Sequence, residues 1–451
     1  MKDLTKGNEA KLIFYFALPM FIGNIFQQLY NTFDSIIVGR FIGTEALGAV
    51  GTSFPIIFLL VSLLIGITMG STILIAQYYG AKDIKNVKKT IDTAYIFLFI
   101  ASLIITVLGI LFSKSILMMM NVPKEILPQA ESYLKIMFFG MITMFGYNSI
   151  SAILRGLGDS KTPLYFLIIS TIINIGLDLL FVIVFKWGVA GAAWATVIAQ
   201  GVSFVFGAYY LNRTHEVFKF DIKTMTFDKE IFKKSLKIGL PTGVQQMLFA
   251  LGIMVLQSLV NGFGKETVAA YTAASRIDSF ASMPIMNLGT AISTFVGQNL
   301  GAGREERVKK GFKSTIIMSS IIAVSCSILI YIFGKWLIIL FNADPKVIEI
   351  GVNYLNIVCS FYIIVATMQV INGVLRGAGD TVPTMIISIV TLWFVRVFLA
   401  YILSNKLNSP TGIWWAIPSS WMAGLILTVL YYKNGKWKEK VVIRRSGVNE
   451  N

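Results

Sequence analysis

Four polar side chains recur along the first apolar stretch of the chain: Asn24, Gln27, Asn31 and Asp34, at steps of three, four and three. On an α-helix these steps place all four on one face. Residues 18–39 are long enough to cross a bilayer, where an ionised carboxylate costs roughly 2.5–3.5 kcal/mol on insertion scales. Asp34 must therefore face protein or water, and it is a candidate for binding a proton or a cation. The amides alone would serve equally well as hydrogen-bonding groups between helices.

A second acid, Asp178, lies in a later apolar stretch. Ser170, Asn174 and Asp178 follow one another at steps of four, so they also share one helical face. Two further apolar stretches contribute Asn148 and Thr196. The N-terminal half thus holds two carboxylates, two asparagines and a threonine that could converge on one pocket. Such oxygen ligands suit H⁺ or a hard cation such as Na⁺, bound transiently at the two acids.

The second half of the chain departs from this pattern. When Ser388 is aligned with Ser170, a base, Arg396, stands opposite Asp178. We therefore expect ion coupling to belong to the N-terminal half alone. The alternative is that Arg396 pairs with Asp278 or extends its head group toward the membrane surface.

Polar and soft side chains in both halves are candidates for the lining of a permissive substrate cavity, because methionine repacks around differently shaped molecules. These candidates are Gln27, Tyr30, Asn31, Gln200, Gln246, Gln257, Arg276, Asp278, Met283 and Met286. Residues of this kind in a membrane helix more often serve packing. Asp278 is the exception, since a carboxylate would attract a cationic ligand.

The composition defines the class of protein that carries these residues. The chain has 451 residues, of which 55% are hydrophobic and only 14% charged, which predicts an all-α integral membrane protein. The net charge of +16 does not indicate a nucleic-acid partner, because most Lys and Arg lie in short loops between apolar stretches. Two cysteines, both inside apolar stretches, predict neither a disulfide framework nor a metal site, and we expect no cofactor.

Twelve apolar spans can be drawn along the chain. They lie near residues 13–37, 46–75, 93–113, 130–153, 163–185, 189–211, 235–260, 268–297, 314–334, 350–374, 383–404 and 412–432. We expect twelve transmembrane helices in two pseudo-symmetric six-helix lobes. The division is residues 1–211 for the N-lobe, 212–234 for a cytoplasmic linker, 235–432 for the C-lobe and 433–451 for a basic cytoplasmic tail.

The distribution of charge predicts the orientation of the spans. About 28 of the 39 Lys and Arg fall on the side that holds both termini, and about 8 on the other side. Because positive charge is retained in the cytoplasm, we expect both termini there, in the cytoplasmic (inner) membrane of a cell.

Two motifs occur once in each half, about 221 residues apart. AQYYGAKD around Gln77 matches VGQNLGAGRE around Gln298, and RGLGD from Arg155 matches RGAGD from Arg376. Each matched loop lies on the cytoplasmic side in both halves, so the repeat is parallel, with six spans in each copy. Together with the opening LPxxxxxxxxxLYNTFDSIIVGR, these features resemble the MATE (multidrug and toxic compound extrusion) family over essentially the whole chain, and most closely its DinF-like branch.

The resemblance implies a cation-coupled antiporter that exports organic, often cationic, compounds in exchange for H⁺ or Na⁺. Carried over residue by residue, it implies coupling residues Asp34, Asn148, Asn174, Asp178 and Thr196. The NorM-like branch uses acids of the seventh and tenth helices, where this chain has amides. The partners it implies are small organic molecules and the lipid bilayer, with the transporter acting as a monomer.

Three alternative functions differ in what they require of the sequence. A flippase for lipid- or oligosaccharide-linked precursors needs a strongly basic cavity, and the spans hold few bases. An intramembrane enzyme needs a nucleophile–base pair or metal ligands, yet the only histidine, His215, lies in a loop and there is no HExxH motif. A channel would differ from a carrier in that its flux does not saturate.

Overall fold

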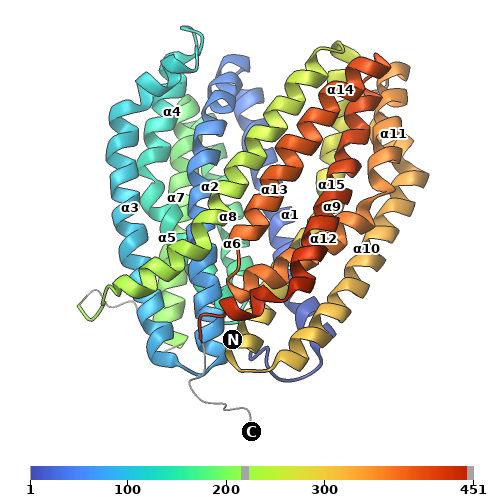
Figure 1. Ribbon diagram of the computed structural model, residues 1–451. Helices are drawn as coiled ribbons and strands as arrows, with labels where there is room; N and C mark the ends of the chain where they lie inside the picture. Colours follow the sequence, from blue (N-terminus) through green and yellow to red (C-terminus); the bar gives the residue numbers. More distant parts are fainter. Residues whose placement is uncertain (1, 215–222, 444–451) are drawn as a thin grey trace. The chain divides into compact units, whose positions relative to one another are not determined.

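The computed structural model describes residues 2–214 and 223–443, and it is helical almost throughout (Figure 1). Residues 215–222 of the expected linker and 444–451 of the expected tail, including His215, lie outside the described residues. The chain forms two compact units. The first consists of Leu18–Gly239 together with the terminal Met1–Lys2, and the second of Asp3–Ala17 and Leu240–Asn451.

The helices of the first half follow the predicted spans. They are α1 (Glu9–Phe41), α2 (Thr44–Gly80), α3 (Ile84–Met119), α4 (Leu127–Phe139), α5 (Met141–Gly156), α6 (Lys161–Asp178), η1 (Leu179–Val184) and α7 (Gly188–Thr214).

The second half repeats this order. Its helices are α8 (Lys229–Asn261), α9 (Lys265–Gly301), α10 (Glu305–Ile339), α11 (Pro345–Cys359), α12 (Tyr362–Ala378), α13 (Val382–Ile389), η3 (Val390–Val397), α14 (Phe398–Leu407), α15 (Thr411–Asn434) and the 3₁₀ helix η4 (Lys436–Lys440).

Length and composition account for the spans. Among the described residues, nine helices are long and apolar enough to cross a membrane, and two bent pairs, α4–α5 and α11–α12, are so when each pair is taken as one span. α9 completes the set of twelve, although it is less apolar than the others. Two lobes of six membrane-crossing segments are therefore present, as the sequence predicts.

The two broken spans differ from the expected continuous helices. Each bends by 49°, at Gly140 in the first half and at the two residues between Cys359 and Tyr362 in the second. At Gly140 there is a packing reason, because a Cβ atom there would lie 2.3 Å from Cγ2 of Val197. α7 thus passes directly against the break, at a point where only glycine fits.

Two other spans contain π-helical segments, in which the backbone hydrogen bonds widen. η1 follows directly after Asp178, and η3 contains Arg396. π-Helical turns are rare and occur often at functional sites. Asp178 and Arg396, which stand opposite each other when the two halves are aligned, therefore lie directly before and within such a segment, respectively.

α8 begins at a well-formed cap. The carboxylate of Asp228 accepts hydrogen bonds from the backbone N–H groups of Glu230 (3.0 Å) and Ile231 (3.1 Å), and it pairs with Lys89 at 3.1 Å. The hydrogen bond from Ile231, followed by that from Lys89, lowers the pKa of Asp228. The backbone N–H of Asp228 in turn donates to Thr93, which fixes the start of α8 against α3.

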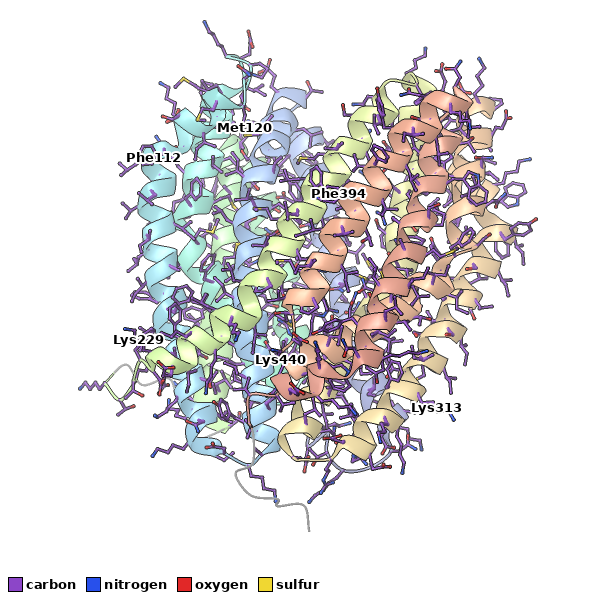
Figure 2. The ribbon with its side chains drawn as sticks, viewed as in Figure 1. Phe112, Met120, Lys229, Lys313, Phe394 and Lys440 are labelled. Atoms are coloured by element: carbon purple, nitrogen blue, oxygen red, sulfur yellow. The ribbon has the colours of Figure 1, made fainter. Side chains whose placement is uncertain are left out.

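Large apolar side chains cover the outward faces of the helices. Phe112 on α3 and Phe394 on η3 are 53% and 70% exposed, and Figure 2 shows both on the surface of their units. A water-soluble protein would bury such residues, so this surface suits contact with lipid. Lys313 and Lys440 of the second unit, by contrast, lie in its lower part in Figure 2.

Candidate functional site

The polar stripe of α1 is divided between an exposed and a buried part. Asn24 and Asn31 are exposed and Gln27 is half-buried, whereas Tyr30 and Asp34 are only 8% and 9% exposed. Tyr30 and Asp34 are four residues apart and so share the inward face of α1. The acid that the sequence singled out therefore faces the interior of its unit.

The second acid is buried more deeply. Asn174 and Asp178 are completely inaccessible to solvent, one turn apart at the end of α6. Asp178 is the last residue before η1, so its side chain lies where the regular helix changes to the wider π form. The spacing of the sequence thus places an amide and a carboxylate together in the core.

Contacts within the first unit bring these helices to one place. The hydroxyl of Tyr30 on α1 and that of Thr196 on α7 are hydrogen-bonded at 2.9 Å. The carboxylates of Asp34 and Asp178 interact electrostatically with each other. Both also interact electrostatically with the hydroxyl of Tyr133 on α4. Four helices therefore meet around the two acids.

Several polar atoms at this meeting point have no protein partner. Oδ1 of Asp34, both carboxylate oxygens of Asp178 and both side-chain atoms of Asn174 are buried without a hydrogen bond. Leaving such groups unsatisfied costs about 1–3 kcal/mol each, and more where they are charged. A proton or an oxygen-liganded cation would compensate this cost directly. The residues present therefore fit the coupling ions named from the sequence.

Two further predicted residues, Asn148 and Gln200, are not hydrogen-bonded to the acids. The side-chain amide of Asn148 donates to the backbone carbonyl of Met144 on its own helix, at 2.8 Å. Gln200 on α7, predicted to line the substrate cavity, is half-buried, and its Oε1 has no partner. Within the described part of the chain, no group of three or more His, Cys, Asp or Glu residues could hold a metal ion.

The predicted substrate-cavity residues of the second half differ in their exposure. Gln246, Arg276 and Met286 are exposed, and Met283 is half-buried. Gln257 donates to Asn261, one turn further along α8, at 2.9 Å.

Asp278 belongs to a network inside the second unit. Its Oδ1 accepts a hydrogen bond of 2.6 Å from the hydroxyl of Tyr362 on α12, and Tyr354 on α11 lies near it. Tyr354 also packs edge-on against the buried Trp414, with ring centroids 5.0 Å apart. The carboxylate therefore has a protein partner, unlike Asp34 and Asp178.

Arg396 follows neither of the alternatives expected for it. It is only 9% exposed, so it does not extend to the membrane surface. Its Nε donates to Ser420 at 2.8 Å, and its guanidinium lies 5.9 Å from the ring centre of Trp421. No ion pair joins it to Asp278 among the described residues, although the two charges interact.

The sequence match to known proteins agrees with this architecture. The MatE family model matches twice, over residues 19–180 and 241–402. The chain is 35% identical to "Probable multidrug resistance protein YpnP" of Bacillus subtilis (strain 168), and the match spans 97% of this chain and 97% of that protein. It is 34% identical to "Probable multidrug resistance protein YoeA" of the same strain, over 98% of this chain and 96% of that protein. The chain belongs to the MatE family.

A solved structure supports the same conclusion. The outward-facing conformation of a multidrug resistance MATE family transporter of the MOP superfamily matches with a TM-score of 0.91 and 25% identity, over 97% of this chain and 99% of that one. The two matches of the MatE model begin 222 residues apart, which agrees with the repeat read from the sequence. As a MatE protein, the chain is a multi-pass secondary transporter and not an enzyme.

Sequence reasoning missed the tyrosines that complete both networks. Tyr133 beside the acids of the first unit, and Tyr354 and Tyr362 around Asp278, are single aromatics in apolar helices, which usually serve packing. The hydroxyl of Tyr30, a residue predicted for the substrate cavity, donates to Thr196. Spacing within one helix carries no information about a partner on another helix, so no signal in one sequence distinguishes these residues.

Proposed function

We propose that this MatE transporter exports organic compounds, many of them cationic, in exchange for H⁺ or Na⁺ that binds at Asp34 and Asp178. The observation that carries this proposal is the group of unpartnered buried oxygens on these two acids. The names of its relatives support the class of substrate, since YpnP is described as a probable multidrug resistance protein and MepA of Staphylococcus aureus as a multidrug export protein.

The proposed cycle uses the free-energy cost of burying two ionised carboxylates without partners. An ion from outside neutralises the pair and stabilises one conformation, and its release inside restores the repulsion between two carboxylates and favours the other. By alternating access, this exchange expels substrate outward. At about 100 mV each translocated charge supplies ~2.3 kcal/mol, which supports about 50-fold accumulation.

Asn174 and Thr196 would position the ion in this cycle. Asn174 lies one turn from Asp178 and offers an amide oxygen, while Thr196 is held in place by Tyr30. Oxygen ligands of this kind accept either ion. The same arrangement therefore supports H⁺ and Na⁺ coupling, and the ion is decided by experiment.

The test is transport by the purified protein in vesicles, driven by an imposed pH gradient or an imposed Na⁺ gradient, with a fluorescent organic cation as substrate. We expect one of the two gradients to drive export in the wild type, and Asp34→Asn to reduce it at least tenfold.

Glu349→Gln is the matched control, because Glu349 is an exposed acid of α11. Its export rate should equal that of the wild type. Gradient-driven export by Asp34→Asn at the wild-type rate would show that this acid does not couple transport.

A further inference from the structure

A groove lies where the last membrane helix ends, away from the acids described above. Its cavity volume is about 220 Å³. It belongs entirely to the second unit and is formed by the ends of α9, α10 and α15 together with η4. Its lining consists of Leu300, Glu305, Val308, Lys309, Tyr432, Lys433, Gly435, Trp437 and Lys438.

The wall of the groove is a fixed part of the fold. α15 ends at Gly435, which adopts the left-handed conformation (φ 76°) and turns the chain into η4. Trp437 is then buried, with its Nε1 donating to the carbonyl of Tyr432 at 3.1 Å. The two rings stack at 5.4 Å, and Phe312 of α10 stacks on Tyr432 at 5.1 Å. The segment after the last span is thereby held against α10.

The rim of the groove is positively charged. Lys309, Lys433 and Lys438 are exposed, whereas Glu305 is the single acid of the lining. Lys309 lies 3.6 Å from Glu306, but both side chains are more than 60% exposed, and such pairs contribute little. Lys438 stays beside the ring of Trp437, 5.9 Å from its centre. Three ammonium groups therefore surround one opening.

The floor of the groove is apolar. Leu300 and Val308 are 8% and 3% exposed, so the cavity combines a buried hydrocarbon surface with a basic rim. Aromatic residues beside it, at the end of a membrane helix, are typical of the level of the lipid head groups. Lys440 on η4 and Lys313 on α10 both lie in the lower part of the unit in Figure 2.

We propose that this groove binds the phosphodiester head group of an anionic phospholipid. The lysines hold the phosphate, and the glycerol lies over Leu300 and Val308. At ~30 Å³ per water molecule the cavity has room for roughly seven waters, which is the size of a glycerophosphate group and much less than a whole lipid. The acyl chains would remain in the bilayer, beside the outward face of the unit.

Basic side chains near a membrane surface gain about 1 kcal/mol each from anionic lipid, which is about fivefold in affinity. Lys309→Gln/Lys433→Gln/Lys438→Gln should therefore bind phosphatidylglycerol on the order of 100-fold more weakly than the wild type. The measurement is native mass spectrometry of the full-length protein in detergent, with phosphatidylglycerol or phosphatidylcholine added, together with the lipid-dependent rise in Tm.

The matched control removes three exposed lysines elsewhere in the same unit, as Lys335→Gln/Lys346→Gln/Lys406→Gln. We expect this control to keep the wild-type preference for phosphatidylglycerol over phosphatidylcholine. Equal losses in the two triple variants would overturn the proposal, because they would indicate a response to net charge alone. Saturation of the groove by soluble glycerol 3-phosphate, at the concentration where the lipid binds, would also overturn it in favour of a free phosphate ligand.

A Tm without added lipid that matches the wild type would show that the groove variant is folded. If its Tm is lower, the pair Lys433→Arg and Lys433→Gln decides the question, since the arginine should keep the wild-type affinity for lipid and the glutamine should lose about fivefold. If neither Lys433→Arg nor Lys433→Gln changes the affinity for phosphatidylglycerol, the proposal is contradicted. The export assay with Asp34→Asn is independent of these measurements.

Discussion

At the scale of single residues, the two units treat their buried acids differently. Asp278 accepts a hydrogen bond from Tyr362, whereas Asp178 has no protein hydrogen bond on either oxygen. A carboxylate whose partners are already in place holds helices together, while one without partners is available to an ion. This difference, and not the number of acids, distinguishes a structural site from a coupling site.

The hydrogen bonds of Asp278 lead to a prediction about its substitution. Asp278→Asn keeps an oxygen that accepts from Tyr362, so we expect export to remain coupled to the ion gradient at close to the wild-type rate. Asp278→Leu leaves the hydroxyl of Tyr362 without its acceptor and should destabilise the protein by about 1–3 kcal/mol. Vesicle transport and thermal melting in detergent check the two outcomes. Loss of coupling in Asp278→Asn would instead assign the acid to transport.

The bond between Tyr30 and Thr196 joins α1 to α7 and leads to a second prediction. Tyr30→Phe should lower the free energy of unfolding by about 0.5–1.5 kcal/mol, because the bond is buried and Thr196 loses its partner. Thermal melting measures the loss. Tyr331→Phe, at a side chain that is 71% exposed, should leave Tm unchanged. A Tm equal to the wild type for both variants would contradict this account of the bond.

At the scale of elements, α9 and α12 approach closely enough for their backbones to touch. A Cβ atom at Gly373 would lie 2.3 Å from the carbonyl oxygen of Gly289, and this oxygen belongs to the rigid backbone of the facing helix. Interfaces between membrane helices favour small residues for this reason. The spacing of the two helices in turn allows Tyr362 to reach Asp278.

This contact predicts opposite effects for two glycine substitutions. Gly373→Ala should destabilise the protein by about 1–3 kcal/mol, because the helices must separate. Gly176→Ala meets nothing within 4 Å and should be neutral or stabilising by up to ~1 kcal/mol, since alanine favours the helix. Thermal melting of the two variants side by side is the measurement. A Tm for Gly373→Ala at or above that of Gly176→Ala would contradict the prediction.

At the scale of the whole molecule, the distribution of lysines predicts which ends of the helices face the cytoplasm. Lys440→Cys should react with a membrane-impermeant thiol reagent only in opened cells, and Lys124→Cys in intact cells, in a background with Cys326→Ser and Cys359→Ser. Both lysines are exposed, so access depends on the side of the membrane. Labelling of Lys440→Cys in intact cells would reverse the predicted orientation.

The sequence was sufficient for the architecture because apolar length and repeated motifs are local properties. The twelve spans, the two six-helix lobes and the MatE family were predicted correctly. The bends at Gly140 and after Cys359 were not, since a break depends on what packs against it, as Val197 does against Gly140. The same holds for the partners of Arg396. Alignment within the sequence placed this residue opposite an acid but could not indicate that its Nε donates to Ser420.

The modest hydrophobicity of α9 has a consequence for the making of this protein. α9 holds Arg276 and Asp278. Unlike the nine helices counted above, it is not apolar enough by its own composition to be a clear membrane span. Tyr362, which donates to Asp278, is synthesised only some eighty residues later, so the ribosome releases α9 before this stabilising neighbour exists. We therefore expect a nascent chain that ends shortly after α9 to leave this helix outside the bilayer, and one extended past α12 to insert it.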